Sequence, residues 1–181
     1  MGNVQATDPV LLLMAMFSRH ETALDWARSR AEADFGPVAL ASERFPFIET
    51  NYYEAEMGTD ILKQFLVFEN FVDPARLAEI KHTTNVWEEE YKSSGGHEEQ
   101  RPLNLDPGYL TEAKLVLATT KDRDHRIYIG QGMFAEITLH FRGGQWQSHP
   151  WTYPNYKRDD YHVFFNRCRE LVRARRRSGK T

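Results

Sequence analysis

The sequence predicts a single α+β domain in which helices pack on a mixed, mostly antiparallel sheet. Its 181 residues are 41% hydrophobic and 27% charged, which suits one globular domain with its own core. Helix and strand patterns alternate in the first half, whereas the second half contains three consecutive strands joined by glycine turns. We therefore expect three to four packed helices and a C-terminal β-meander within residues 9–177, with flexible ends at 1–8 and 178–181.

The predicted domain begins with a strand and a helix. Val10–Phe17 is a continuous apolar run, which is typical of a strand covered on both faces. Ser18 and Glu21 have the spacing of a capping box, so we expect a helix to open here and to end at Gly36-Pro37. Two further strands are expected after this helix, at residues 38–47 and 62–72.

A second long helix and an exposed loop follow. Asp73 before Pro74 is typical of a helix start, because the carboxylate caps free amides and proline suits the first turn. The apolar stripe of this helix is expected to hold Leu77, Ile80, Thr84, Trp87 and Tyr91. Lys92–Arg101 is rich in glycine and charge and predicts a loop. A short helix is then expected at residues 111–120.

The predicted domain ends with the meander and a final helix. Gly143-Gly144 predicts a two-residue hairpin turn, and Gly130–Gly132 predicts a three-residue turn into the same central strand. The three strands are expected at 125–129, 133–142 and 145–149, and the final helix at 159–176.

Strand alternation sorts the central strand of the meander into two faces. The face expected in the core holds Met133, Ala135, Ile137, Leu139 and Phe141. Counting from the turns places Tyr128 opposite Phe134 and Arg126 opposite Glu136. The other face is expected to carry a polar row of Arg126, Glu136, Thr138, His149 and His140. Such a row is either the floor of a ligand pocket or a solvated sheet face with an ordinary ion pair.

Composition limits the compartment and the partners. The single cysteine, Cys168, excludes an internal disulfide and a cysteine-based zinc site, and it fits the reducing cytoplasm, where we expect the protein. Val10–Phe17 is too short to span a bilayer, so no membrane partner is expected. From Lys157 onward, nine Lys or Arg residues outnumber three acidic residues, against a net charge of −3 for the chain. This basic end indicates either nucleic-acid affinity or cations that the dipole of a helix favours at its C-terminus.

Several kinds of active site are excluded by their missing motifs. The chain has no His-x-x-x-His pair on a predicted helix, no Gly-x-Ser-x-Gly turn and no Gly-rich phosphate loop. A zincin, a serine hydrolase of the α/β type and a P-loop nucleotidase are therefore not expected. No metal site is predicted from any ligand spacing, and the sequence does not identify a cofactor.

The candidate site residues gather between residues 104 and 156. Asp106 precedes Pro-Gly in a predicted turn at a strand end, which would aim Asp106 and Tyr109 over the sheet edge. Turn formation alone explains the Pro-Gly step, but it does not require Tyr109. Lys114 and Lys121 would share one face of the expected short helix, either solvated or converging with His125 and Arg126 into a positive pocket.

These segments resemble the Domain of Unknown Function 4416 family, a family of uncharacterised bacterial proteins, from about Pro9 to Arg175. The resemblance rests on Phe45–Phe47, Thr50–Tyr53, Glu56–Gly58, Asn104–Tyr109, Lys114–Lys121, His125–Tyr128, Gly132–Glu136 and Pro150–Tyr156. The family has no established activity to carry over. It implies that the polar groups of residues 104–156 belong to a shared pattern, which favours a functional cluster over a solvated sheet face.

The sequence therefore predicts a polar cleft that binds, and could act on, an anionic small molecule, phosphorylated or nucleotide-like. In this hypothesis Asp106 or Glu136 acts as base and His125 as acid. The ligand-binding residues would be Tyr52, Tyr109, Lys114, Lys121, Arg126, Tyr128, Trp151 and Tyr153. The alternative is a non-catalytic module that binds RNA or a protein partner through the basic final helix and exposed aromatic residues. The oligomeric state is not predicted.

Overall fold

The structure, a computed structural model, describes residue 3 and residues 6–179. One nine-stranded sheet runs in the order β2-β4-β1-β5-β6-β8-β7, with β3 paired to β4 and β9 paired to β8. The strands are β1 (Leu11–Ser18), β2 (Val38–Ala41), β3 (Phe45–Pro46), β4 (Leu62–Phe68), β5 (Asn104–Leu110), β6 (Lys114–Thr119), β7 (Ile127–Gly130), β8 (Met133–Arg142) and β9 (Gln145–Ser148). All pairings between these strands are antiparallel, so the predicted α+β class is confirmed.

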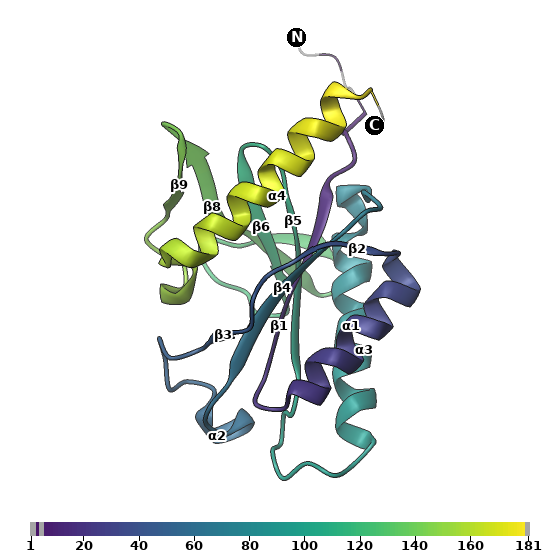
Figure 1. Ribbon diagram of the computed structural model, residues 1–181, viewed down its shortest axis with the longest axis vertical. Helices are drawn as coiled ribbons and strands as arrows, with labels where there is room; N and C mark the ends of the chain where they lie inside the picture. Colours follow the sequence, from purple (N-terminus) through teal and green to yellow (C-terminus); the bar gives the residue numbers. More distant parts are fainter. Residues whose placement is uncertain (1–2, 4–5, 180–181) are drawn as a thin grey trace.

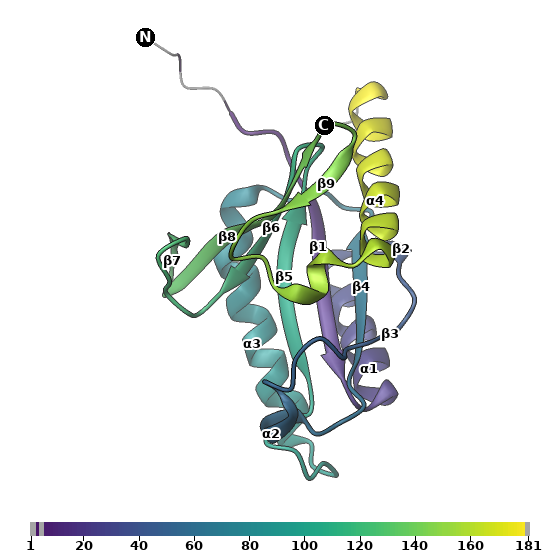
Figure 2. The ribbon, with the colours of Figure 1, turned by 90° about the vertical axis from the view of Figure 1, so that its left-hand side faces the viewer.

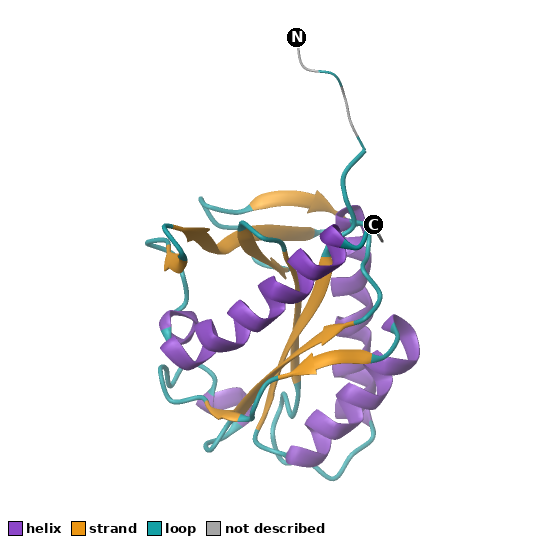
Figure 3. Cartoon of the chain, turned by 45° about the horizontal axis from the view of Figure 1, so that its top comes forward, coloured by secondary structure: helices purple, strands orange, loops and turns teal. Residues whose placement is uncertain are grey.

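Three long helices cover the sheet. The helical segments are α1 (Glu21–Phe35), α2 (Glu54–Met57), α3 (Leu77–Ser93) and α4 (Asp159–Arg177), with short 3-10 turns η1 (Pro74–Arg76) and η2 (Pro154–Lys157). In Figure 1, α1 and α3 lie side by side along one edge of the view, and α4 crosses the upper part of the sheet obliquely. Figures 2 and 3 show α4 as the long helix on its side of the sheet, opposite α3. Among the described residues, no helix has the length and apolarity needed to cross a membrane.

The central strand β1 supplies both cores because its side chains alternate between the two faces. Leu12, Met14 and Met16 pack with residues of α1 and α3. Leu11 and Leu13 pack in the core beneath α4. A strand that is buried on both faces needs an unbroken apolar run, so the prediction from 10–17 is confirmed with a shift of one residue.

Helix α4 covers only part of its face. At the lower end of β1, Phe17 packs against Phe47, Met57 and Ile61, which come from the segment that connects β3 to β4. Loops and the short helix α2 therefore replace a long helix as the cover at this end (Figure 1). Residues 47–53 and 151–156 cover this part of the sheet, and the main cavity forms here.

The helix predicted at residues 111–120 is wrong, because the segment forms the inner strand β6 between β5 and β8. Leu115 and Leu117 lie in the core beneath α4, whereas Val116 and Ala118 pack with Leu77 on the opposite face. The side chains thus alternate between the two faces, as in any strand. This alternation is not visible in the sequence, because all four residues are apolar. Lysines at the two ends of a strand do not share one helical face, so the predicted pairing of Lys114 with Lys121 is lost.

A bulge in β8 corrects the predicted faces of the meander. Leu115 pairs with Leu139 and Val116 pairs with Ile137, so Thr138 is an extra residue in β8. Beyond it the faces exchange: Leu139 lies in the core beneath α4 together with the partner strand's Leu115, whereas Ile137 is 41% exposed. The single core face predicted from 133 to 141 is therefore wrong after the bulge.

Other local predictions divide into confirmed and corrected ones. The turn at Gly143-Gly144 and the pairing of Tyr128 with Phe134 are confirmed, as are the Asp73 cap and the buried stripe of α3. The strand predicted at 38–47 is instead two short strands, β2 and β3, and the strand predicted at 62–72 ends at Phe68. The turn predicted at Asp106 before Pro-Gly is wrong, because these residues lie inside β5 and pair with β1. The predicted flexible ends include residues 1–2, 4–5 and 180–181, which lie outside the described residues.

The capping box predicted at Ser18 is also wrong. Helix α1 has His20 at its N-cap with no side-chain cap. The Ser18 hydroxyl instead accepts a hydrogen bond from the amide of His20 at 2.9 Å and donates one to the carbonyl oxygen of Pro102 at 2.5 Å. Ser18 thus ties the end of β1 to the segment that leads into β5.

We expect Gly108→Ala to destabilise the fold by about 3 kcal/mol, the upper end of the usual cost of overpacking. A Cβ at Gly108 would lie 2.1 Å from the carbonyl oxygen of Val116, a backbone atom of the paired strand that cannot turn away. Urea unfolding measures the change. Gly144→Asn is the matched control, because nothing lies within 4 Å of a Cβ there and Asn tolerates the positive φ. Equal stability of the two variants would contradict the tight β5–β6 contact.

Candidate functional site

The main cavity lies on the α4 face of the sheet, below the start of α4. It has a volume of about 490 Å³, within the range usual for small-molecule sites. We call it the cleft. Its walls are mostly aromatic, and its charged lining residues include four Lys or Arg and two acids. The residues that line it are Phe17, Phe47, Glu49, Thr50, Tyr52, Tyr53, Lys63, Asp106, Leu117, Lys121, Arg123, His125, Arg126, Trp151, Tyr153, Pro154, Asn155 and Tyr156.

Lys63 is the most unusual group in the cleft. It stands on β4 opposite Phe17 and is only 3% exposed. Its ammonium nitrogen lies 4.3 Å from the ring centre of Tyr156 and 5.1 Å from that of Phe17. Among the described residues, no carboxylate lies within 4.0 Å of it. Burial lowers the pKa of Lys63 to about 8, although Asp106 and Glu49 oppose the shift.

Asp106 lies on the same sheet face, where β5 has a free edge. Strand β6 pairs with β5 only from Gly108 onward, so Lys81 of α3 can reach around the edge. The Lys81 ammonium donates to Asp106 Oδ1 at 3.2 Å and to the carbonyl oxygen of Leu105 at 2.6 Å, and Asn104 donates to Asp106 Oδ2 at 3.0 Å. Burial disfavours the carboxylate, but Lys81, Lys63 and other cations outweigh it and lower the pKa of Asp106.

A second carboxylate, Glu136, organises one wall of the cleft. It is 4% exposed and accepts a hydrogen bond from Arg126 Nε at 2.8 Å. His125 Nε2 lies 3.2 Å from the same carboxylate oxygen. Arg126 also donates to the hydroxyl of Tyr153 at 2.8 Å and to the carbonyl oxygen of Lys121 at 2.9 Å. The cross-strand partnership predicted for Arg126 and Glu136 is confirmed, although Arg126 lies just outside β7.

The wall beside His125 fills a gap in the edge of β8. Strands β7 and β9 pair with the two ends of this edge and leave its middle without a strand partner. There Trp151 Nε1 donates to the carbonyl oxygen of Ile137 at 3.0 Å, and Thr152 donates to that of Thr138 at 2.6 Å. The Trp151 ring stacks between His125 and His149, at centroid distances of 5.2 and 4.7 Å. His149 in turn contacts His140. These two histidines therefore form a pair of their own, apart from Arg126 and Glu136 of the predicted polar row.

The mouth of the cleft is positive. Lys121 donates to the hydroxyl of Tyr52 at 3.2 Å and lies over its ring. The two lining acids are already paired, Glu49 with Arg158 at 2.8 Å and Asp106 with Lys81. Of the other lining cations, Arg126 is paired with Glu136, but Lys63, Lys121 and Arg123 have no ion pair among the described residues, which favours an anionic ligand.

A buried hydroxyl adds a further polar group. The Tyr156 hydroxyl is buried and has no hydrogen-bond partner among the described residues, although buried polar groups are usually paired. Burial raises the pKa of Tyr156 well above its ordinary value, so the group is a neutral donor at physiological pH. The Lys63 ammonium, which has no ion pair among the described residues, is the donor that this cavity offers to a ligand's oxygen atoms, and the Tyr156 hydroxyl is buried in the wall.

The structure brings most of the candidate residues together. Tyr52, Asp106, Lys121, His125, Arg126, Trp151 and Tyr153 all line the cleft. Glu136 stands behind His125 and Arg126 and lines a smaller neighbouring cavity with Asp106.

Three candidate residues lie elsewhere. Tyr109 and Lys114 line a separate cavity of about 250 Å³ near the start of β1. Their side chains lie on the α3 face of the sheet, opposite the cleft. Tyr109 pairs with Val116 and Lys114 lies two residues before it, and Val116 packs on the α3 face. Tyr128 is exposed on β7 and rests against Phe134. These three residues are therefore not part of the cleft.

The sequence reasoning missed Lys63 and Lys81. Lys63 is a charged residue in the otherwise largely apolar strand β4, and such a lysine is the signal that could have revealed it. Lys81 lies on the buried side of α3, one residue after the predicted stripe position Ile80. Both lysines needed the tertiary fold to be connected with Asp106, because they come from different elements.

The basic end of the chain is largely used within the fold. Arg169 donates to the carbonyl oxygen of Glu112 at 2.7 Å and lies 3.7 Å from the ring centre of Phe141. Arg173 and Arg176 both form ion pairs with the Glu112 carboxylate. These contacts give the arginines a structural role, and binding of RNA or a protein partner through this helix stays a prediction.

Comparisons with known proteins place the chain in a family. A family model described as a domain of unknown function, DUF4416, matches residues 8–171. The comparisons with curated proteins and with solved structures found no match. Because the matched region covers the cleft and the whole sheet, the chain belongs to the DUF4416 family.

Proposed function

We propose that the cleft binds an anionic small molecule that carries a flat ring, such as a nucleotide-like compound. The observation that carries this proposal is Lys63, a buried ammonium group in an aromatic setting with no carboxylate within 4.0 Å among the described residues. A buried charge without a partner is costly to the fold. A ligand anion would supply that partner, so binding would offset part of the free energy that burial of the Lys63 charge costs the unliganded protein.

The remaining lining suits such a ligand. Lys121 and Arg123 are exposed lining residues and add positive charge for a second anionic group or for a steering field, whereas Arg126 is already paired with Glu136. Tyr52 and Tyr153 are only partly covered, so their rings are available for stacking on a flat ligand, whereas Trp151 is already stacked between two histidines and adds an apolar wall. The ligand would lie with its acid group towards Lys63 and its ring between these side chains.

If the cleft also catalyses a reaction, we propose the following roles for its ionisable groups. His125 is the group placed to move a proton, because Glu136 and the stacked Trp151 hold its ring beside the cavity. Asp106 has a lowered pKa and is held by Lys81, which makes it a weak base and a better electrostatic partner for a cation. Glu136 would position His125 and Arg126 rather than meet the ligand.

Three probes test the binding proposal: adenosine 5′-monophosphate, ribose 5-phosphate and adenosine. We expect the nucleotide to raise the melting temperature, the sugar phosphate to act more weakly and the uncharged nucleoside least, because native-state binding stabilises the fold. Calorimetric titration gives the affinities. A response to adenosine equal to that to the nucleotide would contradict an anion site.

A lysine at the mouth provides a matched comparison. Lys121→Met is expected to weaken binding of adenosine 5′-monophosphate by about tenfold, as removal of one charged contact does. Lys92→Met changes an exposed lysine outside the cleft and should leave the affinity unchanged. Equal affinities of the two variants would place the nucleotide outside the cleft.

A further inference from the structure

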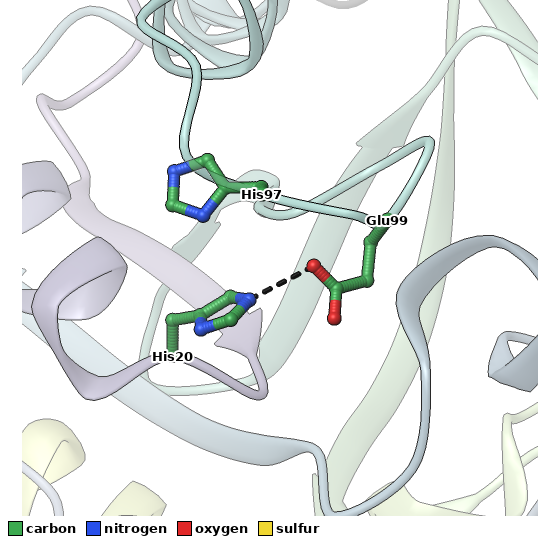
Figure 4. Close-up of side chains that lie close together, drawn as sticks. All are labelled: His20, His97 and Glu99. Atoms are coloured by element: carbon green, nitrogen blue, oxygen red, sulfur yellow. Dashed lines mark hydrogen bonds and ion pairs between the residues drawn. The ribbon is translucent and has the colours of Figure 1, made fainter.

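A histidine and carboxylate cluster lies at the lower end of the molecule, apart from the cleft. His20 stands at the N-cap of α1, and His97 and Glu99 lie in the loop between α3 and β5. One potential ligand atom from each residue lies within 4.8 Å of the others. Figure 4 shows the three side chains turned towards one another. We propose that His20, His97 and Glu99 bind a divalent transition-metal ion, with zinc as the best fit.

The ligand chemistry supports this assignment. Two imidazoles and one carboxylate form a donor set that zinc uses in tetrahedral sites with one open position. His20 Nε2 and Glu99 Oε2 lie 2.9 Å apart. Two ligands on a tetrahedral zinc at about 2.0 Å stand about 3.3 Å apart. A bound ion therefore requires this pair to separate by only a few tenths of an ångström.

An unsatisfied nitrogen provides an independent sign of a missing partner. Nδ1 of His97 is buried and has no hydrogen-bond partner among the described residues. Buried polar atoms without partners are uncommon and call for an explanation such as an absent ion. In Figure 4 the His97 ring presents a nitrogen towards His20 and Glu99. An ion between the three side chains would satisfy it.

Surrounding contacts hold the ligands in place. Arg19 Nη1 binds Glu99 Oε1 at 3.0 Å, which leaves Oε2 for the site. The His97 ring packs on that of Tyr91 at a centroid distance of 4.7 Å. Gly58 lies beside this contact, and its φ of 77° favours glycine. Partners of this kind orient metal ligands and are needed for affinity.

The site would act as a clamp. It joins His20, at the N-cap of α1, to Glu99 in the loop before β5, and these two residues are 79 positions apart in the chain. That loop also contains two adjacent glycines, Gly95 and Gly96, whose φ values of 78° and 84° favour glycine. Fixing such a segment removes much of its freedom, so metal binding should stabilise the whole fold. This inference does not depend on the ligand proposed for the cleft.

Cobalt and zinc titrations test the site on the full chain. We expect one equivalent of Co²⁺ to give the visible absorption of four-coordinate cobalt, Zn²⁺ to displace it, and Zn²⁺ to raise the melting temperature. His97→Ala and Glu99→Gln should each weaken binding by at least about tenfold. The control is His82→Ala, which changes an exposed histidine of α3 and should bind like the wild type.

The outcomes separate this site from chance binding. If both variants bind cobalt as the wild type does, the ion lies elsewhere, for example at the His140–His149 pair, and the proposal is overturned. Absence of any cobalt spectrum at 100 µM free metal, roughly the weakest affinity of interest for a specific site, overturns it as well. Should His97→Ala fail to fold, Glu99→Gln alone decides, because that isosteric change keeps the loop packing.

Discussion

Replacing Lys63 with methionine is expected to stabilise the protein at pH 7 by about 3 kcal/mol. The folded protein lowers the pKa of this buried lysine from 10.5 to about 8, and each pH unit corresponds to about 1.4 kcal/mol. Below pH 8 the ammonium is charged in both states, so its burial cost is fully present. Methionine has a similar length without the charge, so it removes that cost and keeps contact with the Phe17 and Tyr156 rings.

The pH dependence of stability identifies Lys63 as the cause. Between pH 8 and 10.5 the unfolded chain still holds the proton that the folded protein has lost, so wild-type stability should rise with pH across this range. Lys63→Met should lack this rise, and the exposed control Lys92→Met should keep it. Urea unfolding at pH 7, 8, 9 and 10 measures the curves. Parallel curves for wild type and Lys63→Met would refute a strongly lowered pKa.

The same variant should lose the ligand. We expect Lys63→Met to weaken binding of adenosine 5′-monophosphate by about 100-fold, because a desolvated charged contact is worth about 2–3 kcal/mol. A protein that becomes more stable while it loses a ligand shows that the residue is kept for binding rather than for folding. Unchanged affinity with raised stability would keep the pKa argument and overturn Lys63 as the anchor.

Asp106→Ala is expected to destabilise the protein by about 3 kcal/mol at pH 7. The change deprives the buried Lys81 ammonium of its hydrogen-bonded carboxylate and leaves Glu88 as its nearest acid, at 3.9 Å. Asp122→Ala, on the exposed loop after β6, should leave the free energy of unfolding unchanged. Chemical unfolding at pH 7 compares the two variants.

Two further measurements separate the lost ion pair from lost packing. In the double variant Asp106→Ala with Lys81→Met, the cost should be smaller than the sum of the single changes, because no unpaired ammonium remains. The Asp106 contribution should also fade in acid: its pKa is lowered in the folded state, so stability falls as pH drops from about 4 through the folded pKa. Additive costs, or an Asp106 effect that does not decrease in acid, would argue against the pair.

The parts of the fold with a strong local pattern were predictable. The apolar run of β1, the Asp73-Pro74 helix start and the Gly143-Gly144 turn each depend on neighbouring residues alone. The helix wrongly expected over β6 shows the limit of this reasoning. A strand with partners on both sides and cover on both faces loses the polar alternation that identifies strands. Its period is visible only once the two faces are known.

The site was predictable in its composition but only partly in its geometry. The pairing of Arg126 with Glu136 followed from counting residues across a turn, and it is confirmed. The bulge at Thr138 could not be counted, because a single extra residue leaves no trace in an alternating sequence. Lys63 belongs to a strand two places away from β5 in the sheet, so only the strand order connects it with Asp106.

The middle of the β8 edge, which has no strand partner, bears on how a ligand would enter the cleft. The segment that carries Trp151 and Thr152 is fastened to β8 there by side-chain hydrogen bonds instead of a backbone ladder. Detaching it leaves the pairing of β6 with β8 intact, so this opening costs far less than global unfolding. We therefore expect this wall of the cleft to open locally while the sheet stays folded. The amides of residues 151–153 should exchange with solvent deuterium through such local openings, before those of the central strands.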